Sequence, residues 1–153
     1  MATHAEFIEQ NATAENAAGE RYPVWAKETT LGKHKTQEYV SAWQLSEQEY
    51  QRVAETGMVF VRMVAGQPPM HVYWADACQF EGQSQEMKHP DCFDLPVYRQ
   101  AATFNGQPTF TLTSAWKLRE YGLKEVANNH GIVFVSTVGC MPEMEVFGIN
   151  PID

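Results

Sequence analysis

Two stretches of the chain match each other at a nearly constant spacing, and this internal repeat is the strongest constraint on the fold. When residue n is compared with residue n+73 over 22–56, 11 of the 35 positions are identical. When n is compared with n+74 over 57–74, 8 of the 18 positions are identical. The one added residue falls in a turn after a predicted helix. Self-similarity of this kind indicates a repeated supersecondary unit, so we expect two related units.

The sequence of each unit predicts two strands, then a helix, then two further strands. Pro23 opens the first strand, where its missing N–H is tolerated. Ser46 and Glu49 have the spacing of a capping box at the start of a helix, and Gly57 stands where a left-handed residue ends it. In the second unit, Asn105-Gly106 predicts a tight hairpin turn between the first two strands.

The second helix is expected to be the weaker of the two. Arg119 stands at its cap position in place of a serine, and Gly122 lies inside it. Gly131 is the expected left-handed cap at its end. After the helices, the apolar runs beginning at Val59 and Val133 are typical of central strands that are covered on both faces.

The predicted fold class is therefore α+β: two tandem ββαββ-like repeats, packed about a pseudo-twofold axis into one mixed, mainly antiparallel core. Residues 1–21 are interpreted as an N-terminal tail, 22–74 as the first repeat, 75–94 as a linker and 95–150 as the second repeat. Units of this size bury too little surface to be stable alone. We therefore expect one cooperative unit, and a chain cut at Glu81 should not fold.

Charge and cysteine usage limit the classes of partner and the compartment. The formal net charge of −8 opposes binding to nucleic acid or to an anionic membrane, because both require clustered lysine and arginine. No basic, apolar signal peptide is visible at the N-terminus, and the longest apolar run, Met58–Ala65, is too short to cross a bilayer. Three cysteines cannot all pair within one chain, which fits a reducing cytoplasm.

Candidate ligand-binding residues come from the repeat itself. The matched tryptophans could line a cleft, although tryptophans at a junction between strand and helix are more often core anchors. The other candidates lie at positions where the two copies differ in residue type. Sequence drift at solvent-exposed positions also explains these differences. The set is Trp43, Trp116, His71, Tyr73, Arg62 and Glu145. No catalytic residue and no cofactor are predicted.

The only cluster suited to a metal ion lies in the predicted linker. Cys78, His89 and Cys92 are weak zinc-ligand candidates, because a structural zinc site usually has two close ligand pairs and only His89 and Cys92 form one. Asp76 followed by Glu86-Met87-Lys88 is similar to the carboxylate and lysine pattern of metal-dependent nucleases. The alternative for all of them is an ordinary surface loop.

The repeated unit resembles small uncharacterised bacteriophage proteins. The resemblance rests on Ser41-Ala42-Trp43, the capped helix that follows, Gly57, the aliphatic strand after it and Gln67-Pro68-Pro69-Met70. The second unit departs from this pattern, with Glu143 in place of the second proline and Arg119 in place of the cap serine. The resemblance implies a phage origin and brings no assigned activity.

These observations favour a non-enzymatic phage accessory protein in the host cytoplasm. It would bind a host or phage protein, such as a defence component, or a small signalling molecule at the seam between the repeats. One alternative is a structural or decoration protein of the virion. A second is a small metal-dependent hydrolase or nuclease that uses the 76–92 segment. Nucleic-acid and membrane partners are not expected, and homo-oligomerisation is left open.

Overall fold

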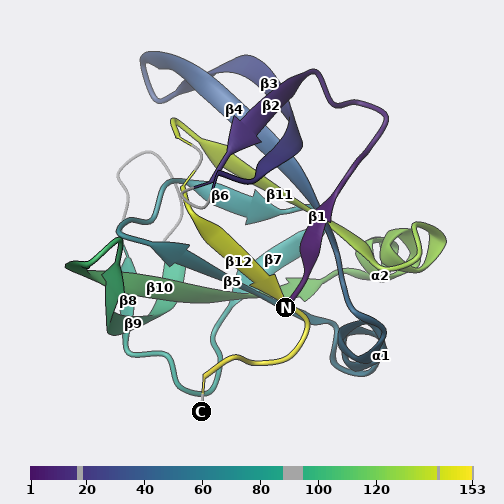
Figure 1. The fold of residues 1–153 in the computed structure, drawn as a ribbon. Helices are drawn as coiled ribbons and strands as arrows, with labels where there is room; N and C mark the ends of the chain where they lie inside the picture. The colour runs from purple at the N-terminus through teal and green to yellow at the C-terminus, as the bar shows by residue number, and fades with distance from the viewer. Residues whose placement is uncertain (17–18, 88–94, 141, 153) are drawn as a thin grey trace.

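The computed structural model describes residues 1–16, 19–87, 95–140 and 142–152, which form twelve strands and two helices (Figure 1). In chain order these are β1 (Thr3–Ala5), β2 (Ala12–Glu15), β3 (Arg21–Leu31), β4 (His34–Gln44), α1 (Glu47–Thr56), β5 (Met58–Val64), β6 (Met70–Val72), β7 (Ala75–Cys78), β8 (Gln85–Met87), β9 (Leu95–Phe104), β10 (Gln107–Leu118), α2 (Glu120–Asn128), β11 (Ile132–Val138) and β12 (Met144–Phe147).

The strands form two six-stranded sheets. Sheet A has the order β2-β3-β4-β11-β6, with β1 paired to β4, and sheet B has the order β8-β9-β10-β5-β12, with β7 paired to β10. Every pairing among the described strands is antiparallel. The α+β class and the mainly antiparallel arrangement are therefore confirmed.

Each sheet contains one central strand from the opposite end of the chain. The chain leaves β4 of sheet A, passes through α1 to β5 in sheet B, and returns to sheet A as β6. It then leaves β10 of sheet B, passes through α2 to β11 in sheet A, and returns as β12. Both neighbours of β5 thus come from residues after 106, and both neighbours of β11 come from residues before 73. The two ends of the chain cannot form their sheets independently.

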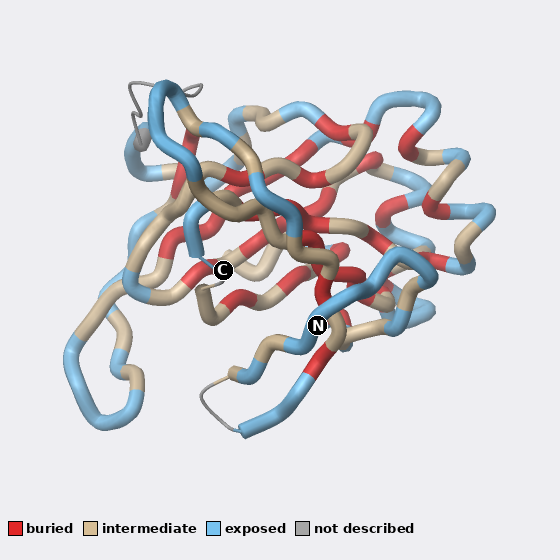
Figure 2. The backbone as a smooth tube through the Cα atoms, turned by 90° about the horizontal axis from the view of Figure 1, so that it is seen from above, coloured by how far each residue is buried: buried red, intermediate tan, exposed pale blue. Residues whose placement is uncertain are grey.

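Buried residues gather in the interior of the molecule (Figure 2), and among the described residues they form a hydrophobic core to which both sheets contribute. Val59 and Val61 of β5 belong to it, as do Val133 and Val135 of β11. Successive side chains along a strand point to opposite faces, so Phe60 and Phe134 point away from this core. The prediction of cover on both faces is confirmed at Phe60 and Ser136, which lie on this second side and are 6% and 0% exposed, whereas Phe134 is half-buried.

The helices differ at their ends as their sequences predict. The Ser46 hydroxyl accepts from the Glu49 N–H at 3.2 Å, the Glu49 carboxylate accepts from the Ser46 N–H at 3.3 Å, and Gly57 ends α1 with φ +70°. The capping box and the glycine cap of α1 are confirmed. Arg119 makes no side-chain cap bond to α2.

The end of α2 differs from the expectation. Its C-cap is Asn129, with φ −96°, rather than Gly131. His130 adopts φ +56°, and Gly131 follows with φ +88°. Two left-handed residues in succession therefore connect α2 to β11.

The segments interpreted as tail and linker contain strands that complete the sheets. β1 and β2 lie within residues 1–21, and β7 and β8 lie within 75–94. β1 pairs with β4 at Ala42–Gln44, where the pairing of β4 with β3 has ended, and β7 occupies the corresponding edge of β10. Exposed backbone N–H and C=O groups at these edges are thereby paired.

The hairpin turn predicted at Asn105-Gly106 is confirmed. Both residues have positive φ values, 51° and 77°, as a two-residue turn with right-handed strand twist requires. The two long hairpins, β3–β4 and β9–β10, extend away from the helices (Figure 1). In the described part of the chain, neither helix has the length and apolar character needed to cross a membrane.

Glu49 is expected to make stability depend on pH. Burial alone would raise its pKa, but the N–H groups of Gly148 and Ser46 donate to the carboxylate and hold its pKa below the usual range. A lowered folded-state pKa contributes stability above the unfolded value of about 4.3 and loses it as the pH falls. Glu49→Gln should therefore lower the free energy of unfolding by about 1–3 kcal/mol at neutral pH, and by less in acid.

Urea unfolding at neutral and acidic pH measures this effect, and Glu47→Gln on the exposed side of the same first turn is the matched control. Equal behaviour of the two variants would contradict the role given to the buried carboxylate.

A chain divided between Trp74 and Ala75 tests the exchange of central strands. Each half alone should lack cooperative unfolding, because β5 and β11 lose both neighbours, and the same is expected for a cut at Glu81. An equimolar mixture should recover the thermal transition, measured by circular dichroism. Cooperative unfolding of either half alone would contradict this interpretation.

Candidate functional site

The outer face of sheet A carries a row of four side chains that cross the sheet. The pairings Trp25↔Val40, Val40↔Ser136 and Ser136↔His71 join them across β3, β4, β11 and β6. Directly opposite residues on neighbouring strands share a face. This row therefore fixes which side chains the outer face presents.

A groove of about 630 Å³ lies on this outer face, between the sheet, α2 and the loop that joins β1 to β2. We call it groove A. Its lining residues are Glu6, Phe7, Ile8, Glu9, Trp25, Val40, Tyr73, Trp74, Glu125, Asn129, Ile132 and Phe134. Its volume is within the usual range for sites that hold a small molecule or a few side chains of a partner.

Aromatic rings meet nearly at right angles around Phe134. Its centroid is 5.7 Å from that of Phe7, 6.3 Å from that of Tyr73 and 6.3 Å from that of Trp74, with interplanar angles of 79°, 89° and 84°. Edge-to-face packing of this kind is favourable and holds each ring in place. Groove A therefore has a firm aromatic wall, and Trp25 stands on β3 beyond it.

Trp74 reaches the groove because the backbone turns sharply at that residue. Its φ is +59°, a conformation that non-glycine residues rarely adopt. The Arg119 N–H donates to its carbonyl at 2.8 Å, and a Cβ on Gly122 would come within 2.6 Å of the same oxygen. The glycine inside α2, which weakens the helix, thus makes room for Trp74.

The charged lining residues of groove A are all acidic. Glu6, Glu9 and Glu125 contribute carboxylates, and no lysine or arginine is among the described lining residues. Lys27 approaches from outside, with its ammonium nitrogen 5.4 Å from the centre of the Trp25 ring.

The pKa values of Tyr73 and His71, which lie at the end of β6, are shifted mainly by burial. Burial raises the pKa of Tyr73, and the nearby Glu38 carboxylate raises it further. Burial lowers the pKa of His71, which favours the neutral imidazole, although Glu38 acts in the opposite direction. Tyr73 is thus a neutral phenol and His71 a predominantly neutral ring at neutral pH.

The predicted tryptophans lie in the core rather than in the groove. Trp43 and Trp116 are 3% and 1% exposed. Each indole N–H donates to the serine two residues earlier, Ser41 at 2.8 Å and Ser114 at 2.9 Å. The Ser-Ala-Trp motif therefore provides its own partner for a buried indole.

The other predicted site residues fall on two separate faces. His71 and Tyr73 lie together at the end of β6, with ring centroids 4.8 Å apart, and Tyr73 lines groove A. Arg62 and Glu145 lie on sheet B, where they are paired across β5 and β12 and form an ion pair at 3.8 Å.

The metal candidates are only partly described by the structure. Cys78 lies half-buried on β7 near Met58, with 3.8 Å between the sulfur atoms, while His89 and Cys92 lie outside the described residues. Asp76 forms a two-point ion pair with Arg119, at 3.0 and 3.1 Å. Within the residues described, no group of three histidine, cysteine or acidic side chains is arranged to hold a metal ion.

Several groove residues were not predicted from the sequence, chiefly Phe7, Trp25, Trp74 and Phe134. A signal for Phe7 existed, because Phe7 and Phe80 match at the same spacing of 73 as the repeats. Trp25 and Trp74 gave no such signal, since the residues found 73 and 74 positions after them are Tyr98 and Gly148.

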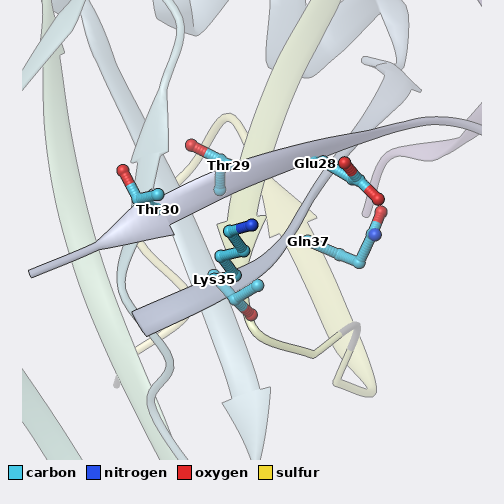
Figure 3. A pocket seen from close by; sticks show the side chains of 6 residues that line it. Glu28, Thr29, Thr30, Lys35 and Gln37 are labelled. Atoms are coloured by element: carbon cyan, nitrogen blue, oxygen red, sulfur yellow. The ribbon is translucent and has the colours of Figure 1, made fainter. Parts of the chain in front are cut away.

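A second hollow, of about 580 Å³, lies on the β3–β4 hairpin (Figure 3). It is lined by Glu28, Thr29, Thr30, Lys35, Thr36 and Gln37. All six belong to the same two paired strands, so the hollow is the polar surface of a single hairpin and no second element closes it. Groove A is the stronger candidate, because the sheet, α2 and the β1–β2 loop together enclose it.

No protein-family model, curated protein or solved structure matches this chain. The site is therefore characterised by its own geometry.

Gly122→Ala should damage groove A through the fold. Its new methyl group would meet the Trp74 carbonyl and Cβ at 2.6 and 2.9 Å, and overpacking of this kind costs about 1–3 kcal/mol. We expect a lower melting temperature and a changed fluorescence of Trp74. Gly66→Ala is the matched control, since nothing lies within 4 Å of its added Cβ. An unaltered Gly122→Ala protein would contradict the tight packing.

Proposed function

We propose that this protein is a non-enzymatic binding protein, and that groove A is its recognition surface at the seam of a tandem duplication. The observation that carries the proposal is an asymmetry between two equivalent faces. One face has an open aromatic groove, and the other is closed by the chain's own residues.

The pairing registers support the duplication. β1 aligns His4 with Trp43, and β7 aligns Ala77 with Trp116, so both partners in the two pairs differ by 73. β2 aligns Ala12 with Val24, and β8 aligns Gln85 with Val97, again with both members displaced by 73. The proposed units therefore begin near residues 1 and 74, and include the segments interpreted as tail and linker.

Two turns support the same extension. The Phe7 N–H donates to the Gln10 side chain at 3.0 Å, and the Phe80 N–H donates to the Gln83 side chain at 3.0 Å. The reverse backbone bonds, from Gln10 to Phe7 and from Gln83 to Phe80, measure 3.3 and 3.2 Å. A matching order of strands in sheets A and B, each with one strand from the other unit, fits a pseudo-twofold axis.

The seam is where groove A is built. β3, β4, β6 and the β1–β2 loop belong to the first proposed unit, while α2 and β11 belong to the second. Sites between related units are common places for ligands, because both units contribute walls.

The equivalent face of sheet B is filled. Phe80 packs on Phe60 at 6.2 Å, as Phe7 packs on Phe134. Gly148 takes the position of Trp74, and the segment after it covers the loop equivalent to 7–10, with Asn150 donating to the Glu81 carbonyl at 3.3 Å and Ile152 packed on Gly82.

Groove A favours a protein partner over an anionic small molecule. Three carboxylates at its rim would repel the phosphates of a signalling nucleotide. Ile8 of the rim is 97% exposed, an apolar side chain that a protein surface would cover. The resemblance to small phage proteins suggests that the partner is a host component.

Matched charge substitutions test the proposed function. Ile8→Glu should abolish capture of a host protein from lysate without altering the melting temperature, because the Ile8 side chain is solvent-exposed. Ile149→Glu, on the exposed segment after β12, should retain the same protein, identified by mass spectrometry. Equal capture by both variants and the unaltered protein would exclude groove A as the recognition surface.

A further inference from the structure

The outer face of sheet B contains a cation that sheet A lacks at the equivalent place. The pairings Tyr98↔Thr113, Thr113↔Arg62 and Arg62↔Glu145 form a row that corresponds to the row on sheet A. The Arg62 guanidinium lies 5.0 Å from the centre of the Phe147 ring. On sheet B, the Phe147 ring therefore has a cationic partner, Arg62, from the same chain.

On sheet A the same positions hold a different set of side chains. Arg62 corresponds to Ser136, Phe147 to Tyr73 and Glu145 to His71. The Ser136 hydroxyl donates to the Glu38 carboxylate at 2.6 Å, so a carboxylate lies near Tyr73. In the part of the chain that the structure describes, no cation–ring contact involves Tyr73.

The rest of groove A has the character of a site for a cation. Aromatic faces attract cations through the ring quadrupole, and three glutamates, Glu6, Glu9 and Glu125, line the same groove as the aromatic wall. Lys27 already lies over the Trp25 ring, so an aromatic face at the groove's edge is accessible to a positive charge.

We infer that groove A binds the guanidinium of an arginine that a partner protein presents, with the ring of Tyr73 and the carboxylates of the rim as its main contacts. This rests on the proposed function, and it adds the chemistry of the partner. An arginine is preferred to a lysine because its planar guanidinium can stack on aromatic rings, and on sheet B it is an arginine, Arg62, that lies over the Phe147 ring. A polypeptide is preferred to a small ion because the groove spans β3 to β6, roughly 14 Å at about 4.8 Å per strand.

Indole NMR signals of the full-length protein provide a direct test. The probe is an acetylated and amidated Gly-Arg-Gly peptide at millimolar concentration, with Gly-citrulline-Gly as its uncharged isostere. Trp25 and Trp74 line the groove, while Trp43 and Trp116 are buried internal controls. We expect the arginine peptide to shift the first pair of signals and not the second, and the citrulline peptide to shift neither.

Matched variants locate the contact. Tyr73→Leu should weaken binding of the arginine peptide about three- to tenfold, the usual range for loss of a cation–ring contact. Phe147→Leu makes the corresponding change on sheet B and should leave the affinity unaltered. An equal effect of both variants would overturn the inference.

The remaining outcomes separate this inference from the proposed function. Equal shifts with the arginine and citrulline peptides, or shifts with tetramethylammonium alone, would overturn the arginine assignment. Absence of shifts with the arginine peptide would do the same, and the proposed function would stand if Ile8→Glu still abolished capture of the host protein. Concentration-dependent dimers that Trp25→Ala abolishes in sedimentation would instead assign groove A to a second copy of the chain.

Discussion

The exchange of β5 and β11 between the sheets is the constraint on which the rest of the structure depends. Each of these strands is central in a sheet whose other long strands come from the opposite end of the chain. The hydrogen bonds of both are therefore satisfied only when the whole chain has folded. The same exchange brings α2 and β11 against β3, β4 and β6, so the framework of the core also creates groove A.

The packing differs between the two places where a helix meets the strand end beneath it. In one place Glu49 of α1 packs on Gly148, whose added Cβ would lie 2.7 Å from that of Glu49. In the corresponding place Gly122 of α2 packs on Trp74. In the first place the helix supplies the large residue, Glu49, and in the second place it supplies the glycine, Gly122. As a result, Trp74 lies in groove A, whereas the buried Glu49 carboxylate fills the other position.

Local features could be predicted from the sequence because their causes are local. The capping box at Ser46, the left-handed Gly57 and the Asn105-Gly106 turn depend on a few neighbouring residues and were correct. Within β6, Met70 and Val72 are buried and His71 between them is half-buried, as the alternation of side chains along a strand requires. The strands within 1–21 and 75–94 were missed, because short polar segments become strands only when an edge of β3, β4, β9 or β10 is free to pair with them.

The sequence by itself determined the two helices, the long strands that precede and follow them, the capped ends of α1 and the turn at Asn105-Gly106, since hydrophobic spacing and capping act over a few residues. Only the tertiary structure decided which strands are neighbours, because pairing between β4 and β11 joins residues almost a hundred positions apart and leaves no local pattern. It also decided the site. Phe7, Trp25, Tyr73 and Phe134 are scattered along the chain, and they meet only because two strands change sheets.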